Sequence, residues 1–137
     1  MNKQKVLEDF KVNVKLKLAA LWMSFMFLYL YVDYFHLYMP NKIEEILKGK
    51  VFAFEITQGF IFTALTLATI PILMISLSVT LTARVNRMTN IIVATILIPY
   101  MLFNLTGEAW LHMIFAAIVE VLLLCLIIRH AWKWARI

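Results

Sequence analysis

The residue with the clearest chemical potential in this chain is Glu120, a carboxylic acid inside the apolar run EAWLHMIFAAIVEVLLLCLIIRH at residues 108–130. The nearest lysine or arginine in the sequence is Arg129, nine residues away. An acid at the centre of a bilayer costs about 2.5–3.5 kcal/mol on insertion scales. We therefore expect this side chain to face other helices rather than lipid, and to carry its proton at neutral pH.

Polar residues at a similar predicted depth are candidate partners for Glu120. Pro99 cannot donate to the carbonyl of the residue four positions earlier, and Pro71 interrupts another apolar run near the same depth, which together favour a cavity. Two interpretations stay open: an acid that exchanges a proton, or an interhelical hydrogen bond worth about 0.6–2 kcal/mol. The candidate partners are Thr66, Thr69, Thr95 and Tyr100.

A second set of polar residues is predicted to meet at one mouth of the same bundle. Asp33 and His36 are three residues apart, and Glu108 and His112 are four apart, so each pair shares one helix face. Such a set suits a divalent metal, a proton relay or a cationic ligand, and a solvated rim without a ligand is the fourth interpretation. The full set is Asp33, His36, Glu55, Asn104, Glu108 and His112, with Tyr29 one turn below Asp33.

The elements that would position these residues are membrane-spanning helices. The chain has 137 residues, of which 64% are hydrophobic and 15% charged, too few polar residues to cover a soluble core. A spanning helix needs about 20 mostly apolar residues. Charged residues delimit four such runs, so we predict an all-α polytopic four-helix bundle in one domain over residues 1–137. The predicted spans are about 18–38, 54–81, 90–105 and 110–128.

The distribution of basic residues predicts that both termini face the cytoplasm. Ten of the 13 lysines and arginines lie in the two tails and between the second and third spans, whereas only Lys42, Lys48 and Lys50 lie on the other side. We therefore expect a multi-pass protein of the bacterial cytoplasmic (inner) membrane. Because the positive charge lies at the ends of apolar runs, we expect the lipid bilayer as its partner and no nucleic acid.

Two short amphipathic segments are predicted around the first span. Residues 1–17 have apolar positions at helical spacing, which predicts a helix lying on the inner leaflet. Residues 41–48 predict a short helix in the first outer loop, with Asn41 as its N-cap, Glu44 in the capping-box position and Gly49 as its stop. This second helix either anchors at the headgroups or covers the bundle as a lid.

The strings YVDYFHLYMP, TNIIVATILIPY and LFNLTGEAW resemble an uncharacterised bacterial family of small four-helix membrane proteins of unknown function. This similarity extends over nearly the whole chain. More distantly, the layout resembles DoxX-like and EXPERA-type four-helix membrane proteins. EXPERA proteins use acids inside the bundle to bind amphiphilic amines or to transfer protons on sterols, so this resemblance implies Glu120, Asp33 and Glu55 as the acids to test.

The sequence thus predicts a small integral membrane protein with a polar pocket inside the bundle, which binds an amphiphilic or cationic small molecule. Proton-coupled transport is one form of this activity. Two alternatives stay open: a membrane-embedded isomerase or oxidoreductase component, and a structural accessory subunit without a ligand. The sequence contains no phosphate loop, CxxC, HExxH or GxSxG motif. Enzyme status, cofactor, metal and oligomeric state, a homo-oligomer included, stay open.

Overall fold

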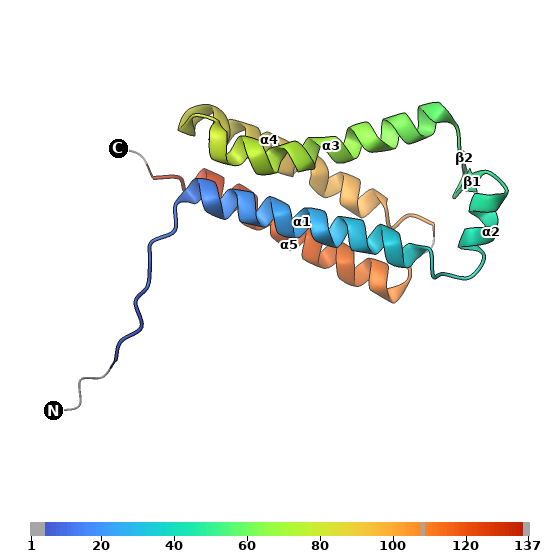
Figure 1. Cartoon of the computed structure of the whole chain (residues 1–137), viewed down its shortest axis with the longest axis horizontal. Helices are drawn as coiled ribbons and strands as arrows, with labels where there is room; N and C mark the ends of the chain where they lie inside the picture. Colours follow the sequence, from blue (N-terminus) through green and yellow to red (C-terminus); the bar gives the residue numbers. More distant parts are fainter. Residues whose placement is uncertain (1–4, 108, 136–137) are drawn as a thin grey trace.

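The computed structural model describes residues 5–107 and 109–135, and the chain is mostly helical (Figure 1). Each of the four longest helices is long and apolar enough to cross a membrane, as expected of a multi-pass membrane protein. The predicted helical class and the four apolar helices are therefore confirmed. These helices are α1 (Val14–His36), α3 (Gln58–Thr80), α4 (Ala83–Phe103) and α5 (Leu111–Trp132).

The two ends of the bundle differ. One end, here called the termini end, holds the start of α1, the short turn between α3 and α4, and the end of α5 (Figure 1). The other end, here called the hairpin end, holds the short helix α2 (Lys42–Leu47) and a hairpin of β1 (Lys50–Val51) and β2 (Phe54–Glu55). The loop from α4 to α5 lies at this hairpin end as well.

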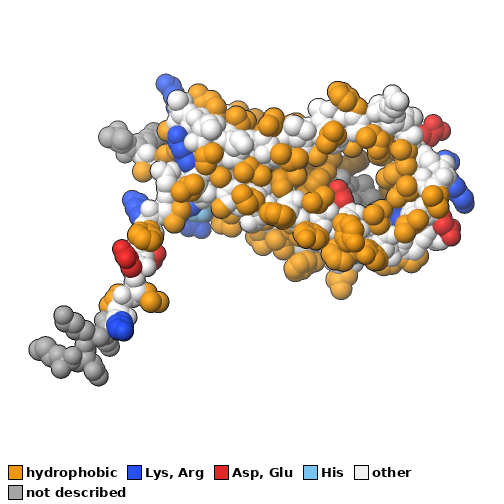
Figure 2. Space-filling model, in the orientation of Figure 1, with side chains coloured by type: hydrophobic (Ala, Val, Ile, Leu, Met, Phe, Trp, Pro, Cys, Tyr) orange, Lys and Arg blue, Asp and Glu red, His pale blue; other side chains and the backbone are white. Residues whose placement is uncertain are grey.

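The buried core holds the bundle together mainly in the half near the termini. Helix α5 packs against α1 and α4, and α1 packs against α3. Many large apolar side chains point outward instead, where a bilayer would cover them (Figure 2). The buried cluster consists of Leu18, Trp22, Phe25, Met74, Ala94, Leu97, Met101, Leu124, Ile127 and Ala131.

Helix α3 packs against the bundle over only part of its length. Its buried residues are Pro71, Met74 and Ser78, and no residue from position 58 to position 70 is buried. Toward the hairpin end α3 and α1 diverge (Figure 1). Pro71 has no N–H, so it cannot bond the carbonyl of Leu67 as other helical residues would. Pro71 lies where the buried stretch of α3 begins, and the half of the helix before it runs apart from α1 toward the hairpin end (Figure 1).

Three of the long helices extend beyond the predicted spans, and in α1 the extension is at the start, at Val14 rather than at about residue 18. Helix α4 begins at Ala83 rather than at about residue 90, and α5 ends at Trp132 rather than at about residue 128. Charges mark where the hydrocarbon ends, but a helix continues wherever its residues find partners. The Nε of Arg87 donates to the carbonyl of Ala131 at 3.1 Å, and its guanidinium lies 5.3 Å from the centre of the Trp132 ring.

The N-terminal segment differs from its prediction. Residues 5–13 form neither helix nor strand and are exposed, and α1 begins only at Val14. There Asn13 caps the helix, because its Oδ1 accepts a 2.8 Å hydrogen bond from the backbone N–H of Lys15. An isolated amphipathic helix this short gains its stability from the membrane surface on which it lies.

Helix α2 forms where the sequence predicts it, but the predicted N-cap is wrong. Asn41 has a φ of 67°, in the left-handed region, and its side chain makes no capping hydrogen bond. The chain enters α2 through a turn instead, in which the N–H of Lys42 donates to the carbonyl of Met39 at 3.3 Å. Gly49 follows the helix with a φ of 79°, as the predicted stop requires.

The hairpin was not predicted, because two-residue strands are too short to show an alternating pattern. Lys50 pairs with Glu55 and Val51 with Phe54. Glu55 therefore lies in β2 and does not begin a helix, contrary to the sequence-based prediction. Helix α3 begins later, where Thr57 Oγ1 accepts a 3.1 Å hydrogen bond from the N–H of Phe60.

Candidate functional site

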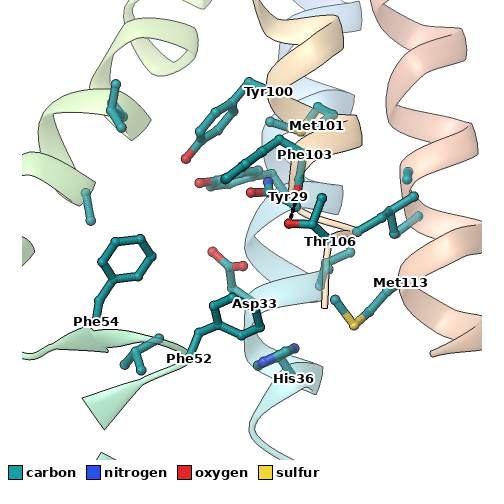
Figure 3. Close-up of a pocket in the computed structure, with 18 of the residues that line it drawn as sticks. Tyr29, Asp33, His36, Phe52, Phe54, Tyr100, Met101, Phe103, Thr106 and Met113 are labelled. Carbon is teal, nitrogen blue, oxygen red and sulfur yellow. Dashed lines mark hydrogen bonds between the residues drawn. The ribbon is translucent and has the colours of Figure 1, made fainter. Parts of the chain in front are cut away.

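A cavity of about 570 Å³ lies inside the bundle at the hairpin end (Figure 3). All four long helices contribute to its wall, and residues of α2, the hairpin and the α4–α5 loop line it as well. Sites for small molecules usually occupy about 300–1,000 Å³ and have mostly apolar walls with a few polar groups. This cavity fits that description, since most of its lining side chains are apolar.

Two acids of the predicted site line this cavity from different helices, Asp33 from α1 and Glu120 from α5. Glu120 is only 5% exposed. The two carboxyl groups lie close enough to interact electrostatically. Ala116 and Ala117, one turn earlier on α5, share the face of Glu120 and leave room above it because their side chains are small. The acids therefore face shared open space rather than tight packing.

Tyr29 and Tyr100 add two phenol hydroxyls to the same group. Their side chains point toward one another from α1 and α4 (Figure 3). Tyr29 interacts electrostatically with Tyr100, Asp33 and Glu120. Asp33 lies one turn after Tyr29 on α1, so both face the cavity. Two acids and two phenols thus form one polar group, here called the acid–tyrosine cluster, in a mostly apolar cavity.

His36 and Asn104, both predicted to lie at the mouth of the bundle, also line the cavity. A lining residue that the sequence analysis missed is Lys42, whose side chain is 9% exposed. Its Nζ lies 3.7 Å from Glu45 Oε2. A lysine in a six-residue helix usually extends into solvent, whereas this one is buried in a helix that packs against β1, which the sequence does not indicate. Its ion pair offsets its charge locally.

The structure does not bring the predicted threonine partners to Glu120. The hydroxyls of Thr66, Thr69 and Thr95 each donate to a carbonyl one turn earlier in their own helix, at distances of 2.7, 2.7 and 2.6 Å. None of the three lines the cavity. Depth along a span can be read from the sequence, but the face on which a residue lies depends on how the helix is rotated. Tyr100 is the one candidate partner that reaches the cavity.

Two further predicted mouth residues, Glu55 and His112, do not line the cavity. Glu55 is exposed in the hairpin and does not line the cavity. His112 lies in the first turn of α5, with its ring edge-on to Trp110 at 6.2 Å, and its buried Nε2 has no hydrogen-bond partner among the described residues. Glu108 lies outside the described residues. Within residues 5–107 and 109–135, no group of three His, Cys, Asp or Glu side chains could hold a metal ion.

Phenylalanine rings cover the cavity at the hairpin end. Phe52 has a φ of 57°, and it projects its ring against Gly107 of the α4–α5 loop, where any Cβ would collide with it. Phe54 stacks on Phe60 of α3 with ring centroids 5.9 Å apart. Phe52, Phe54 and Phe60 all line the cavity. The hairpin is thereby held to both the α4–α5 loop and α3, and it acts as a lid.

A buried polar network, absent from the sequence predictions, lies below the cavity toward the termini end. Asn90 Oδ1 accepts hydrogen bonds from Trp22 Nε1 at 2.7 Å and from Ser78 Oγ at 3.3 Å. Asn86 Nδ2 donates to the carbonyl of Ser78 at 2.6 Å. All four residues are buried. The network joins α1, α3 and α4, and it fixes their relative positions in the half of the bundle nearer the termini end.

Residues 4–137 match the model of a family of unknown function, DUF6326. The chain belongs to this family. The predicted membership in an uncharacterised family is therefore confirmed, and the resemblance to DoxX-like and EXPERA-type proteins stays a prediction. No curated protein and no solved structure matches the chain. Membership of a family of unknown function implies no activity, so the cavity is the feature of this chain that bears on function.

Proposed function

We propose that the protein binds a small amphiphilic cation, such as an alkylamine, in the cavity at the hairpin end. The observation that carries this proposal is that Asp33 and Glu120 share one mostly apolar cavity. Burying a carboxylate such as that of Glu120 is costly unless an opposite charge or hydrogen bonds offset its desolvation, and the more exposed Asp33 adds a second negative group beside it. An ammonium group between these two acids would supply that charge.

The rest of the cavity suits the other half of such a ligand. Aromatic and aliphatic side chains provide apolar contacts for a hydrocarbon chain, and ring faces attract cations. The hydroxyls of Tyr29 and Tyr100 are available as hydrogen-bond acceptors beside the acids. An anionic ligand is disfavoured, because Lys42 is already paired with Glu45.

In this proposal Glu120 is the group that exchanges a proton. A carboxyl at its depth is expected to hold its proton when the cavity is empty, and a bound cation favours the ionised form. Binding then releases a proton, which couples ligand occupancy to protonation as a proton-coupled transporter requires. Asp33 and His36 line the same cavity from the end of α1 that lies at the hairpin end.

We further propose that the protein resides in the bacterial inner membrane with both termini in the cytoplasm. The start of α1, the end of α5 and the α3–α4 turn lie at one end of the bundle, and most of the lysines and arginines of the sequence lie in or next to these segments. The cavity would then open in the outer half of the membrane. Labelling by a membrane-impermeant maleimide tests this orientation in a Cys125→Ser background. Lys48→Cys should react in intact cells and Arg84→Cys only after permeabilisation, and the reverse pattern would overturn the orientation.

Titration calorimetry of the protein in lipid nanodiscs tests the binding itself. Dodecylamine should bind, and dodecanol, which has the same chain without the charge, should bind at least tenfold more weakly, equivalent to about 1.4 kcal/mol. Asp33→Asn and Glu120→Gln should each weaken dodecylamine binding by a similar factor. Glu55→Gln is the matched control, because this acid lies at the same end of the molecule but outside the cavity. Equal binding of amine and alcohol, or unaltered binding in both cavity variants, would refute the proposal.

A further inference from the structure

We propose that the ligand enters the cavity sideways from the lipid, through the gap between α1 and the first half of α3, and not through the hairpin end. This inference rests on the proposed function and deepens it, because it specifies the ligand as a single-chain amphiphile that is dissolved in the bilayer. Its ammonium head would reach the acid–tyrosine cluster while its chain follows the gap back toward the lipid.

The hairpin end is closed by three contacts within the described residues. The ring of Phe52 lies against Gly107 of the α4–α5 loop. Phe54 stacks on Phe60 of α3. The base of the hairpin is closed by a 2.8 Å hydrogen bond from the N–H of Ile56 to the carbonyl of Gly49, and β1 packs against α2. A ligand arriving from water at this end would have to displace aromatic rings that line the cavity.

The side of the bundle is open by contrast. No residue from position 58 to position 70 of α3 is buried, and α3 diverges from α1 toward the hairpin end. Figure 2 shows a hollow in this face of the molecule, with an acidic side chain visible inside and hydrophobic side chains around it. The cavity therefore meets the surface where an apolar face of the bundle would contact acyl chains.

The residues beside this gap suit a hydrocarbon chain. Val32 lines the cavity from α1, and Ala64 and Leu67 line it from α3. All three are apolar, and Ala64 is small enough to leave a passage. One turn separates Val32 from Tyr29, and Asp33 is its direct neighbour. A head group that passes Val32 therefore reaches the acid–tyrosine cluster at once, without crossing further apolar wall.

Binding kinetics of a dodecylamine that carries a dansyl group at the far end of its chain test the route. The protein is held in nanodiscs and dansyl fluorescence is followed by stopped flow. In Ala64→Trp an indole narrows the gap, so the association and dissociation rates should fall together at least fivefold while the dissociation constant stays within about twofold. Ile96→Trp is the matched control, because Ile96 is 63% exposed on α4 and does not line the cavity; its rates should equal those of the wild type.

Other results separate the route from the binding itself. An association rate in Ala64→Trp that stays within twofold of the wild type would overturn the lateral route and leave the proposed function standing. A larger change in association in Phe52→Ala than in Ala64→Trp would place the entrance at the hairpin end and overturn it too. Absence of dansyl-dodecylamine binding to the wild type would overturn both proposals. Val32→Trp narrows the gap from the side of α1 and replaces Ala64→Trp if that variant does not fold.

Discussion

The indole N–H of Trp22 donates a 2.7 Å hydrogen bond to the side-chain oxygen of Asn90, a residue 68 positions later in the chain. Both side chains are fully buried, and neither lines the cavity. Because α1 and α4 meet through this bond, and Ser78 of α3 shares the same acceptor, three helices depend on one amide. Below the cavity the bundle is thus joined by polar contacts as well as by apolar packing.

Replacing Trp22 by Phe should lower the free energy of unfolding by about 1–2 kcal/mol. The substitution removes the shorter of the two hydrogen bonds to Asn90 Oδ1 and leaves this buried oxygen with the 3.3 Å bond from Ser78 alone. Unfolding of the purified protein in mixed micelles by increasing detergent denaturant measures the change. Trp110→Phe is the control, since Trp110 is 44% exposed, and a loss of equal size in both variants would contradict the prediction.

Replacing Arg87 by Lys should destabilise the protein by about 0.5–1.5 kcal/mol although the charge is kept. A lysine cannot present a planar donor to the Ala131 carbonyl and at the same time lie flat on the Trp132 ring. Thermal unfolding followed by circular dichroism is the measurement. Arg84→Lys, an exposed position on the same helix, should leave the midpoint unchanged; if the two variants behave alike, the guanidinium contact contributes nothing.

Two glycines with similar backbone angles should respond differently to alanine. Gly49 and Gly107 have φ values of 79° and 96°, so alanine at either position carries a backbone strain of about 1–2 kcal/mol. An added Cβ at Gly49 meets no atom within 4 Å, whereas at Gly107 it collides with the ring of Phe52. Gly107→Ala should therefore lower the midpoint of thermal unfolding more than Gly49→Ala.

The double variant Gly107→Ala/Phe52→Ala separates the collision from other effects. Removing the ring should make the additional alanine at position 107 no worse than alanine at position 49, because only the backbone strain remains. If Gly107→Ala is equally harmful with and without the Phe52 ring, the contact between hairpin and loop does not hold the lid in place.

Binding of dodecylamine should release a proton from Glu120. Calorimetric titrations in buffers of different ionisation enthalpy measure this release, because the released proton is taken up by the buffer. The wild type should release up to one proton per ligand. Glu120→Gln should release none, since the side-chain amide does not ionise. Asp33→Asn is the comparison: it should weaken binding, but the ligand that still binds should release a proton as in the wild type.

The sequence was sufficient to predict the four long helices and the acids worth examining. Uncharged runs between charged residues identify apolar helices, because charge in the hydrocarbon is costly. Glu120 is conspicuous for the same reason. Asp33 is conspicuous because it lies near the C-terminal end of a helix, where the helix dipole disfavours an acid. Both acids line the cavity in the structure. These predictions depend on the free-energy cost of placing single charged residues in hydrocarbon, which can be read from the residue type and its neighbours in the sequence.

Features that depend on the rotation or contact of elements were not predictable in the same way. Thr95 has the right depth for Glu120 but faces away from the cavity. Asn86 lies before the predicted third span, so its burial followed only from the longer helix α4. Lys42 is buried although it lies in the short helix α2, which packs against β1, and no local pattern indicates this. The hairpin depends on Phe52 finding Gly107 more than 50 residues later.

The half-packed state of α3 has a consequence for how this protein can change over generations. The half of α3 after Pro71 is joined to Asn90 through Ser78, while the half before Pro71 lines the cavity. Substitutions in the half before Pro71 can change which ligand the cavity binds without removing the buried hydrogen bonds that hold the helices together. Selection for binding of a new ligand and selection for folding stability therefore act on separate stretches of one helix.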